Sequence, residues 1–479
     1  MNLTDEPWIP IIRDDGTRER VSLIALFKEG ETIRDLAVNP PQRVALMRLL
    51  ICITQAALDG PQDEKDWFQS QKNLAQNVIV YLEKWGHAFE LYGSTPFMQA
   101  KDIEPLDNAT LDKLNFNLSA GNNSVLFDHQ ASPSGRVHGP EWCALMLLTF
   151  QCFSPGGLIG TTQWGENKTT KTSEHAPAIE GSMIHTYIRG ENLLITTWMN
   201  LLTKKMIAEF PGMNFGRPIW EDDNILKGDP EAARISTASY LGRLVPLSRA
   251  IFLNKNKNFT LANGLSYPKL PAQREPCATV VRRGKGKNEK DIYIAVNLSR
   301  HPWRELSSVL SLSKTSIAGG AACLRHLIYI KSDRVDIWTG GMAADKGKIL
   351  DVAEWNFSLP IEMLNKTELL VYEKGVELAR KGEYSLREAV KAWYQEMAVD
   401  SKSISYEKAL MSYWALLDKQ YLVLIRCISS SEPLGQAWFP IICRAMNTGF
   451  SNSCPHTTPR QIQAFAIAGQ KLRLKKPED

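Results

Sequence analysis

The sequence has no apolar run that approaches the roughly 20 residues needed to span a bilayer. Its formal net charge is only +4, from 56 Lys and Arg against 52 Asp and Glu. The first residues, MNLTDEPWIP, lack the basic segment and following apolar segment of a secretory signal. We therefore expect a cytoplasmic protein that does not contact a membrane.

Cysteine is sparse and scattered. The eight cysteines stand singly, with no CxxC pair that could hold zinc and no dense spacing typical of a disulfide framework. We therefore expect small buried thiols in a reducing compartment, with no metal and no other cofactor.

Motifs that carry catalysis are also missing. There is no GxSxG nucleophile motif, no HExxH zinc motif, and neither SPGGLIGTT nor GGMAADKGK ends in the GK[ST] of a phosphate-binding loop. The one dense acidic cluster, Glu221, Asp222 and Asp223, is better explained as a solvated loop than as carboxylates that clamp a metal. We expect no enzyme, with a metal-dependent nuclease at these acids as the less favoured alternative.

Apolar patterns predict buried helices over residues 42–60 and 141–153 and a further helix over 191–210. From about residue 245 to 360 the chain has short apolar alternations separated by Asn-Gly, Arg-Gly and Gly-Gly, which predict small sheets with hairpins. The segment 339–350, TGGMAADKGKIL, is most simply a glycine-rich turn between two strands.

The last part of the chain has a helical period throughout. Amphipathic patterns with aromatic residues on their apolar faces predict four helices, over residues 386–397, 410–424, 435–448 and 459–474. We expect an α+β fold, with a large mixed α/β N-terminal domain over residues 1–364 and a C-terminal four-helix bundle over 365–479.

Positive charge concentrates between residues 251 and 290, where nine Lys and Arg stand against two Glu. The nine are Lys255, Lys257, Lys269, Arg274, Arg282, Arg283, Lys285, Lys287 and Lys290. Arg282, Arg283, Lys285 and Lys287 fall on a predicted hairpin loop, which either only carries solvated charge or also contacts nucleic-acid phosphates non-specifically.

Several segments in a fixed order resemble one protein family. They are MNLTDEPWIPI at the start, TPFMQ at 95–99, SAGNNSVLFDHQ at 119–130, the Pro-Gly-Gly loop at 155–160, HTYIRGENLLITTWMN at 185–200, NFTLANGL at 258–265 and TGGMAADKGKIL at 339–350. Together they are similar to the large subunit (CasA family) of the type I-E CRISPR surveillance complex, Cascade. In that family a mixed α/β domain also precedes a four-helix bundle.

The resemblance implies a non-catalytic subunit. It would recognise the protospacer-adjacent motif of double-stranded DNA from the minor groove, help to open the duplex for the guide RNA, and recruit a helicase-nuclease. The implied partners are the CRISPR guide RNA, target DNA, that effector and the other Cascade subunits: the backbone, the small subunit and the subunit at the guide 5′ end. The alternative is a structural scaffold subunit of a ribonucleoprotein that does not itself contact the DNA sequence.

The resemblance also implies four groups of site residues. They are a glycine loop (Gly156, Gly157, Gly160), a lysine finger (Lys257, with Lys255 second), a wedge (Asp345, Lys346, Gly347), and a loop toward the guide end (Phe127, Asp128, His129). Glycine lets backbone enter a minor groove about 6 Å wide, and a lysine can donate to the acceptors that every base pair shows there. The family's wedge glutamine is replaced by Lys346, whose stem can still insert between base pairs.

Overall fold

The chain folds into two compact units in a computed structural model. The first unit contains Met1–Leu298, Ser311–Ile330 and Asp336–Phe357, and the second contains Ser299–Leu310, Lys331–Val335 and Ser358–Asp479. The structure describes residues 1–479 except 101–102, 105–107, 119–127, 129–134, 159–162, 165–166, 169–171, 174, 228, 254–257, 299, 313–316, 346–347, 431 and 478–479. The predicted boundary between residues 364 and 365 stays a prediction.

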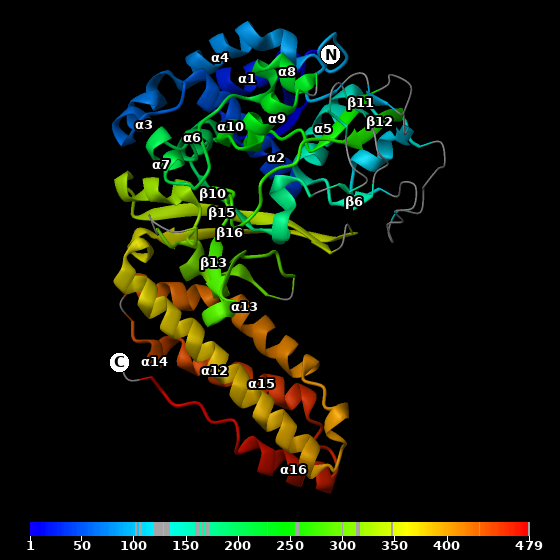
Figure 1. Ribbon diagram of the computed structural model, residues 1–479. Helices are drawn as coiled ribbons and strands as arrows, with labels where there is room; N and C mark the ends of the chain where they lie inside the picture. Colours follow the sequence, from blue (N-terminus) through cyan, green and yellow to red (C-terminus); the bar gives the residue numbers. More distant parts are fainter. Residues whose placement is uncertain are drawn as a thin grey trace. The chain divides into compact units, whose positions relative to one another are not determined.

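The first unit mixes helices with small sheets (Figure 1). Its helices are α1 (Leu23–Lys28), α2 (Pro40–Ala57), α3 (Glu64–Ser70), α4 (Leu74–Trp85), α5 (Pro140–Phe153), α6 (Leu193–Met199), α7 (Lys204–Ala208), α8 (Asp223–Leu226), α9 (Pro230–Thr237) and α10 (Tyr240–Leu244). The sheets have the strand orders β2-β1-β3, β10-β15-β16, β11-β12-β5, β13-β14, β4-β7-β8 and β6-β9.

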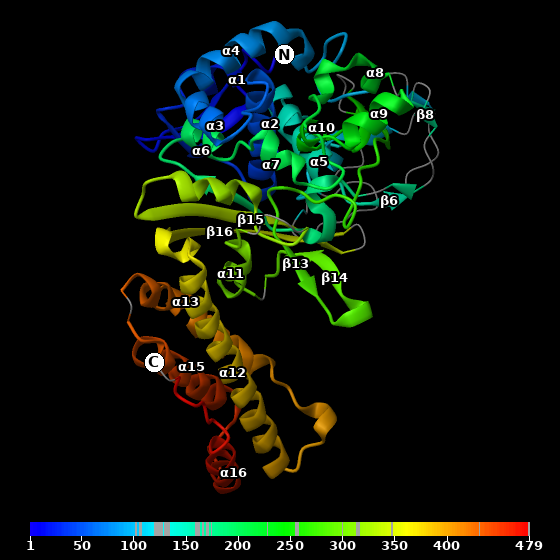
Figure 2. The ribbon, with the colours of Figure 1, turned by 60° about the vertical axis from the view of Figure 1, so that its left-hand side comes forward.

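The strands are short except for the last two. Their bounds are β1 (Ile9–Arg13), β2 (Arg18–Val21), β3 (Ile33–Leu36), β4 (Ile103–Glu104), β5 (Asn108–Thr110), β6 (Gly157–Leu158), β7 (Gln163–Trp164), β8 (Asn167–Lys168), β9 (Thr172–Ser173), β10 (His185–Arg189), β11 (Arg249–Leu253), β12 (Asn258–Asn263), β13 (Val280–Arg283), β14 (Lys290–Tyr293), β15 (Arg334–Asp345) and β16 (Lys348–Pro360). Helices α2, α6 and α10 lie on one side of the sheet β10-β15-β16 in both ribbon views (Figures 1 and 2).

Helix α2 is the buried helix predicted at 42–60. Asn39 caps it by accepting a hydrogen bond from the backbone of Gln42, whose side chain accepts one from the backbone of Asn39. Such a reciprocal cap contributes about 1 kcal/mol, and Pro40 at the first helical position costs no hydrogen bond. Apolar residues on several faces, including Val44, Leu49 and Ile53, are fully buried.

The single helix predicted at 191–210 is wrong, because the chain forms α6 and α7 with a break between them. Asn200 ends α6, and its side chain donates to the carbonyls of Ile188 and Thr196 instead of facing solvent. Thr203 then caps α7 through the amide of Met206. The local helical pattern was real, but long-range hydrogen bonds to β10 end it after two turns.

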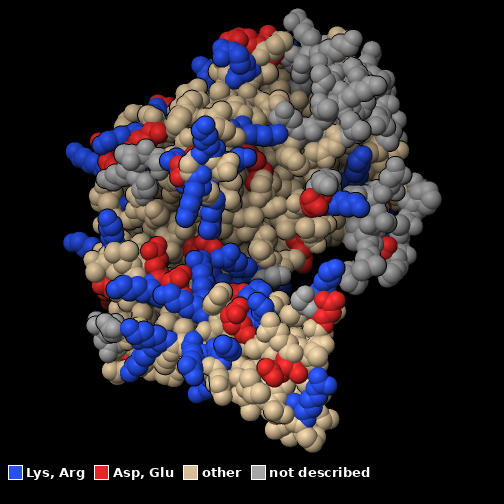
Figure 3. All heavy atoms as spheres, turned by 60° about the horizontal axis from the view of Figure 1, so that its bottom comes forward, with Lys and Arg blue, Asp and Glu red and all other residues tan. Residues whose placement is uncertain are grey.

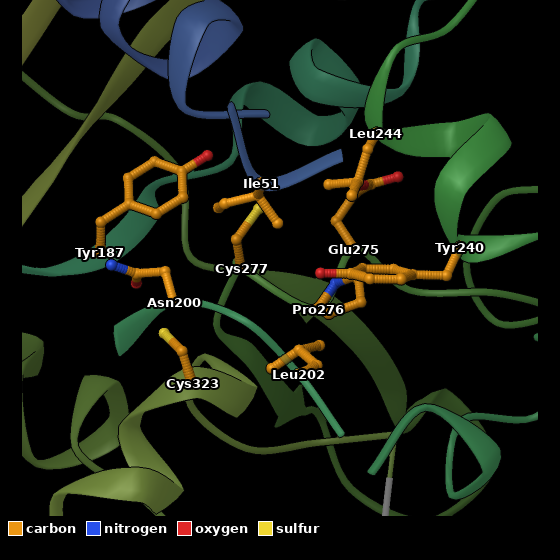
Figure 4. Close-up of a pocket in the computed structure, with 10 residues that line it drawn as sticks. All are labelled: Ile51, Tyr187, Asn200, Leu202, Tyr240, Leu244, Glu275, Pro276, Cys277 and Cys323. Atoms are coloured by element: carbon orange, nitrogen blue, oxygen red, sulfur yellow. The ribbon is translucent and has the colours of Figure 1, made fainter. Parts of the chain in front are cut away.

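The core of the first unit contains a buried ion network. Glu275 accepts hydrogen bonds from Arg48 at 2.7 Å and from Arg243 at 2.6 Å, and the three side chains are at most 2% exposed. Glu275 also lines a small cavity of about 20 Å³, together with Ile51, Tyr187 and Cys277 (Figure 4). Room for about one water molecule is too little for a substrate, so we assign this cavity to the core.

The second unit contains the predicted helical bundle. Its helices are α11 (Leu306–Val309), α12 (Lys366–Glu396), α13 (Glu407–Ser429), α14 (Leu434–Ala437), α15 (Phe439–Ser453) and α16 (Pro459–Gly469). The aromatic faces are core, as predicted: Tyr413 and Trp438 are fully buried and donate to carbonyls of α12 at 2.6 and 3.0 Å. The mixed first unit and the helical C-terminal region confirm the predicted fold class.

A segment far from the bundle in sequence belongs to the second unit. Trp303 donates to Asp418 of α13 at 2.7 Å, and the Arg304 guanidinium lies 3.7 Å from the centre of the Trp414 ring and pairs with the same Asp418. Tyr372 of α12 donates to the Trp303 carbonyl. These contacts explain why residues 299–310 belong to this unit.

Among the described residues, no helix is both long and apolar enough to cross a membrane. The cysteines are free thiols, and six of the eight are buried: Cys52, Cys143, Cys152, Cys323, Cys427 and Cys454. Burial raises the thiol pKa of Cys152 to about 12, so this side chain stays protonated and acts as a small apolar residue. The expectation of buried thiols is confirmed for these six.

Candidate nucleic-acid interface

The predicted glycine loop begins where α5 ends. Pro155 cannot continue the helix, and the Gly156 amide donates to Nδ1 of His175 at 2.9 Å. Gly157 opens β6, which pairs with β9, and its exposed backbone faces open space because an added Cβ would meet no atom within 4 Å. The loop is therefore held at its base while Gly157 remains accessible. Gly160 lies outside the described residues.

The predicted lysine finger is the turn of a hairpin. Strands β11 and β12 pair in antiparallel register up to Leu253 and Phe259, and β5 pairs with the other edge of β12. Leu253, the last residue before the turn, donates its amide to the buried Gln99 side chain at 2.8 Å. The hairpin stem is thus fixed in the core. Lys255 and Lys257, which stand between these strands in the sequence, lie outside the described residues.

The predicted wedge lies at the end of a longer hairpin. Strand β15 ends at the exposed Asp345, β16 begins at Lys348, and Lys346 and Gly347 between them lie outside the described residues. Ser182 fixes this end, because its hydroxyl accepts from the Ala344 amide at 3.0 Å and donates to its carbonyl at 3.1 Å. In both ribbon views these strand ends lie on the same side as β6 (Figures 1 and 2).

The prediction that 339–350 is a glycine-rich turn is wrong for Gly340 and Gly341. Gly340 and Gly341 are buried within β15. A Cβ at Gly340 would lie 2.6 Å from the Trp338 ring, and one at Gly341 would lie 2.6 Å from the Met183 carbonyl. Gly340 and Gly341 therefore permit close packing within the sheet and do not form a flexible turn.

Asp128, from the loop predicted to reach the guide end, belongs to a charged cluster. Arg136 donates to Asp128 at 2.5 Å and lies 3.4 Å from Asp112, which also bonds His138 at 2.6 Å. Asp112 is buried, and His138 stacks on Trp142 at 3.6 Å between ring centres. Asp128 is therefore held by the protein itself. Phe127 and His129 lie outside the described residues.

The basic hairpin β13-β14 confirms the predicted loop, and its charged tip is exposed. Arg282 pairs with Asp291 at 2.9 Å across the hairpin, so its charge is largely neutralised. Arg283, Lys285 and Lys287 are exposed at the tip. On the face drawn in Figure 3, Lys and Arg side chains gather with Asp and Glu among them. Positive and negative side chains therefore occur together on this face.

The structure corrects the expectation for one charged residue and gives the surroundings of the acidic cluster. Arg274, counted in the basic segment, is buried and donates to the carbonyls of Ile317 and Gly320, so it cannot contact phosphate. The acids at 221–223 do not converge: Glu221 accepts from Tyr81, and Asp222 caps α8. Among the described residues, no group of three or more His, Cys, Asp or Glu could hold a metal ion. Glu221 and Asp222 therefore have structural partners, and Asp223 is exposed in the first turn of α8.

The stems of the glycine loop and the lysine hairpin are joined by two residues that the sequence analysis missed. Arg249, the first residue of β11, donates to the Pro155 carbonyl, and Gln151 of α5 hydrogen-bonds the Arg249 backbone. Gln151 stands in the largely apolar helix segment TFQCF, and an amide side chain there signals a buried hydrogen-bond partner. That signal could have identified it.

Comparisons with known proteins agree with the predicted family. The model of the family described as CRISPR-associated protein Cse1 matches residues 2–445. CasA/Cse1 of Thermus thermophilus is 26% identical over 414 residues, which cover 83% of this chain and 78% of the relative.

Solved structures share the fold. The crystal structure of Thermus thermophilus CasA has a TM-score of 0.77 at 21% identity, and that of Thermobifida fusca Cse1 has 0.74 at 18%; each alignment covers 98% of both chains. A chain of a CRISPR RNA-guided surveillance complex has a TM-score of 0.75 at 16% identity, covering 98% of this chain and 99% of that one. Because the family model matches most of the chain, the chain belongs to the CRISPR-associated protein Cse1 family.

Proposed function

We propose that the chain is the non-catalytic large subunit of a CRISPR RNA-guided surveillance complex. In this role it recognises the protospacer-adjacent motif of double-stranded DNA from the minor groove, promotes opening of the duplex, and recruits a helicase-nuclease. Its partners are then the guide RNA, the target DNA and the other subunits of the complex. The family supports the role in the complex, and the arrangement of the stems supports the mode of DNA recognition.

One observation carries the proposal. The exposed glycine loop and the hairpin whose turn holds Lys255 and Lys257 are tied together at their bases by Gln151 and Arg249. A·T pairs show only acceptors in the narrow minor groove. Backbone without a side chain can enter this groove, and a lysine amine can donate to these acceptors. Recognition of this kind separates A·T from G·C more readily than A·T from T·A.

The proposal is tested with the complex assembled on a guide RNA, by gel mobility shift on duplexes with and without the flanking motif. We expect tighter binding when the motif is present, and we expect Lys257→Ala to remove most of that difference. Equal binding to both duplexes would instead support the scaffold alternative. Cleavage of DNA by the isolated protein with Mg²⁺ would support the nuclease alternative.

We expect Lys346→Ala to impair strand opening more than initial docking. Its alkyl stem at the end of the β15-β16 hairpin would insert between base pairs, and unstacking costs a few kcal/mol per step. A fluorescent base analogue beside the motif reports unstacking, and fluorescence anisotropy of the same duplex reports docking. Normal unstacking in the variant would contradict a wedge at this position.

We predict that the basic hairpin contributes to the salt dependence of DNA affinity but not to the preference for the motif. Each phosphate contact contributes about 0.9 to the slope of log affinity against log salt. We expect Lys285→Ala with Lys287→Ala to reduce this slope by about 2 and to leave the preference for the motif unchanged. Arg282→Ala is the matched control and should change the slope less, because Asp291 already pairs with Arg282. An unchanged slope in the double variant excludes this hairpin from the interface.

A further inference from the structure

Arg249 is a buried cation between the two proposed reading elements. Its side chain is almost fully buried, and its guanidinium donates to the Pro155 carbonyl at 2.6 Å and to the Ser248 carbonyl at 3.4 Å. Pro155 directly precedes Gly156, so this bond holds the first peptide of the glycine loop. Among the described residues, no carboxylate forms an ion pair with Arg249.

The backbone of Arg249 is fixed as firmly as its side chain. The Gln151 side chain donates to the Arg249 carbonyl at 2.8 Å and accepts from the Arg249 amide at 2.9 Å. Gln151 lies in the last turn of α5, three residues before Ser154, and is fully buried. Helix α5, the glycine loop and the start of β11 therefore meet in one buried joint.

Burying a guanidinium without a carboxylate partner costs free energy, so Arg249 is an unusual residue for fixing a loop. Burial lowers the pKa of Arg249 to about 10, yet the group remains charged at neutral pH. Two other buried arginines of the core, Arg48 and Arg243, share the carboxylate of Glu275. Because the charge of Arg249 is unneutralised, it favours an anion such as a DNA phosphate near the loop.

We propose that Arg249 is the positioning residue that sets the glycine loop against the lysine hairpin, so that both reach the same minor groove. This inference rests on the proposed function, and it adds a residue that itself need not touch DNA. The hydrogen bond to Pro155 fixes the loop, and the strand that begins at Arg249 leads in five residues to the lysine turn. One residue thus sets the spacing of the two elements.

Arg274 provides a matched control. It is buried to the same degree, its pKa is also lowered to about 10 by burial, and it too donates to backbone carbonyls, those of Ile317, Ala278 and Gly320. Among the described residues it has no carboxylate partner, and none of its bonds reaches the glycine loop. Arg274→Met therefore reproduces the loss of a buried cation without loosening the proposed joint.

The experiment measures affinity of the assembled complex for motif-bearing and motif-free duplexes, with the melting temperature of each variant. We expect Arg249→Met to weaken binding to the motif-bearing duplex roughly tenfold and to change binding to the motif-free duplex much less. Arg249→Lys, which retains the charge and one donor, should restore part of the difference. Arg274→Met should keep the full preference for the motif at a similar loss of melting temperature.

The outcomes separate this inference from the function on which it rests. The role of Arg249 is overturned if Arg249→Met keeps the full preference for motif-bearing DNA, or if Arg274→Met loses as much of this preference. In either case, a loss of the preference in Lys257→Ala still supports the proposed function. No motif preference in the wild-type complex overturns both. If Arg249→Met does not fold, amide hydrogen exchange over residues 154–158 decides: exchange faster in Arg249→Lys than in Arg274→Lys supports the joint, and equal exchange refutes it.

Discussion

Glu275→Gln is expected to lower the free energy of unfolding by about 3–5 kcal/mol, the cost of leaving a buried charge without its partner. Two buried guanidiniums, of Arg48 and Arg243, depend on this one carboxylate, at 2.7 and 2.6 Å. Glutamine has the same shape but replaces one acceptor oxygen with an NH2 donor, so the loss combines the missing charge with one broken hydrogen bond to a guanidinium. The measurement is urea unfolding of the wild type and the variant at neutral pH.

The Glu275 carboxylate also makes the stability of the fold depend on pH. Burial raises the pKa of Glu275, but the charges and hydrogen bonds of Arg48 and Arg243 outweigh burial and bring the pKa down from 4.5 to about 2. Because the folded pKa lies below the unfolded one, the stabilisation is complete above the unfolded pKa and is lost as the pH falls from about 4.5 towards 2. The wild type should lose stability in this window more steeply than Glu275→Gln.

An exposed pair of the same chemistry serves as the control. Arg234 and Glu231 on α9 are joined at 2.7 Å, but both side chains are more than half exposed. Glu231→Gln should leave the free energy of unfolding nearly unchanged, because water screens such pairs. Equal losses in Glu231→Gln and Glu275→Gln would contradict the assignment of the ion network to the stability of the core.

Gly157→Asp is expected to reduce affinity for motif-bearing DNA by roughly 100-fold or more, since juxtaposed like charges cost several kcal/mol. The variant should fold normally, because an added Cβ at Gly157 meets no atom within 4 Å and the residue is exposed. An aspartate there would occupy the groove and face the DNA phosphates. Equilibrium binding of the assembled complex and the melting temperature of the variant measure the two effects separately.

Steric and charge effects at Gly157 can be resolved with two further variants. Gly157→Ala adds only a methyl group and should weaken binding less than the aspartate does. Gln76→Glu adds the same charge in the exposed first turn of α4, which favours an acid, and should leave DNA binding unchanged. Normal affinity in Gly157→Asp would show that this backbone does not enter the groove.

The local sequence pattern predicted helices where apolar periodicity and terminal residues agree. Helices α2 and α5 were predicted within a few residues of their bounds for this reason. The part of α12 before residue 386 was not predicted as a helix, because it contains Gly375 and Gly382, which usually weaken a helix. A Cβ at these positions would lie 2.3 Å from Leu424 and 2.5 Å from Tyr413, so packing between helices selects glycine.

The site could be predicted only in part for a related reason. The glycine loop and the lysine finger were expected because ordered segments of the sequence resemble a known family, and no local pattern alone marks them as a site. The joint between them connects Gln151 and Arg249, which are 98 residues apart. A polar residue in an apolar helix marks Gln151, but no local pattern shows that its partner is Arg249, and nothing in the segment around Arg249 distinguishes it from the exposed basic residues that follow.

The central claim is that the chain contacts DNA through the minor groove. The most direct measurement is the affinity of the assembled complex for duplexes in which single motif purines lack either the minor-groove N3 or the major-groove N7 acceptor, each replaced by carbon. We predict that loss of N3 weakens binding in the wild type but not further in Lys257→Ala, and that loss of N7 has no effect. Weaker binding on loss of N7, with no effect of N3, would contradict the account.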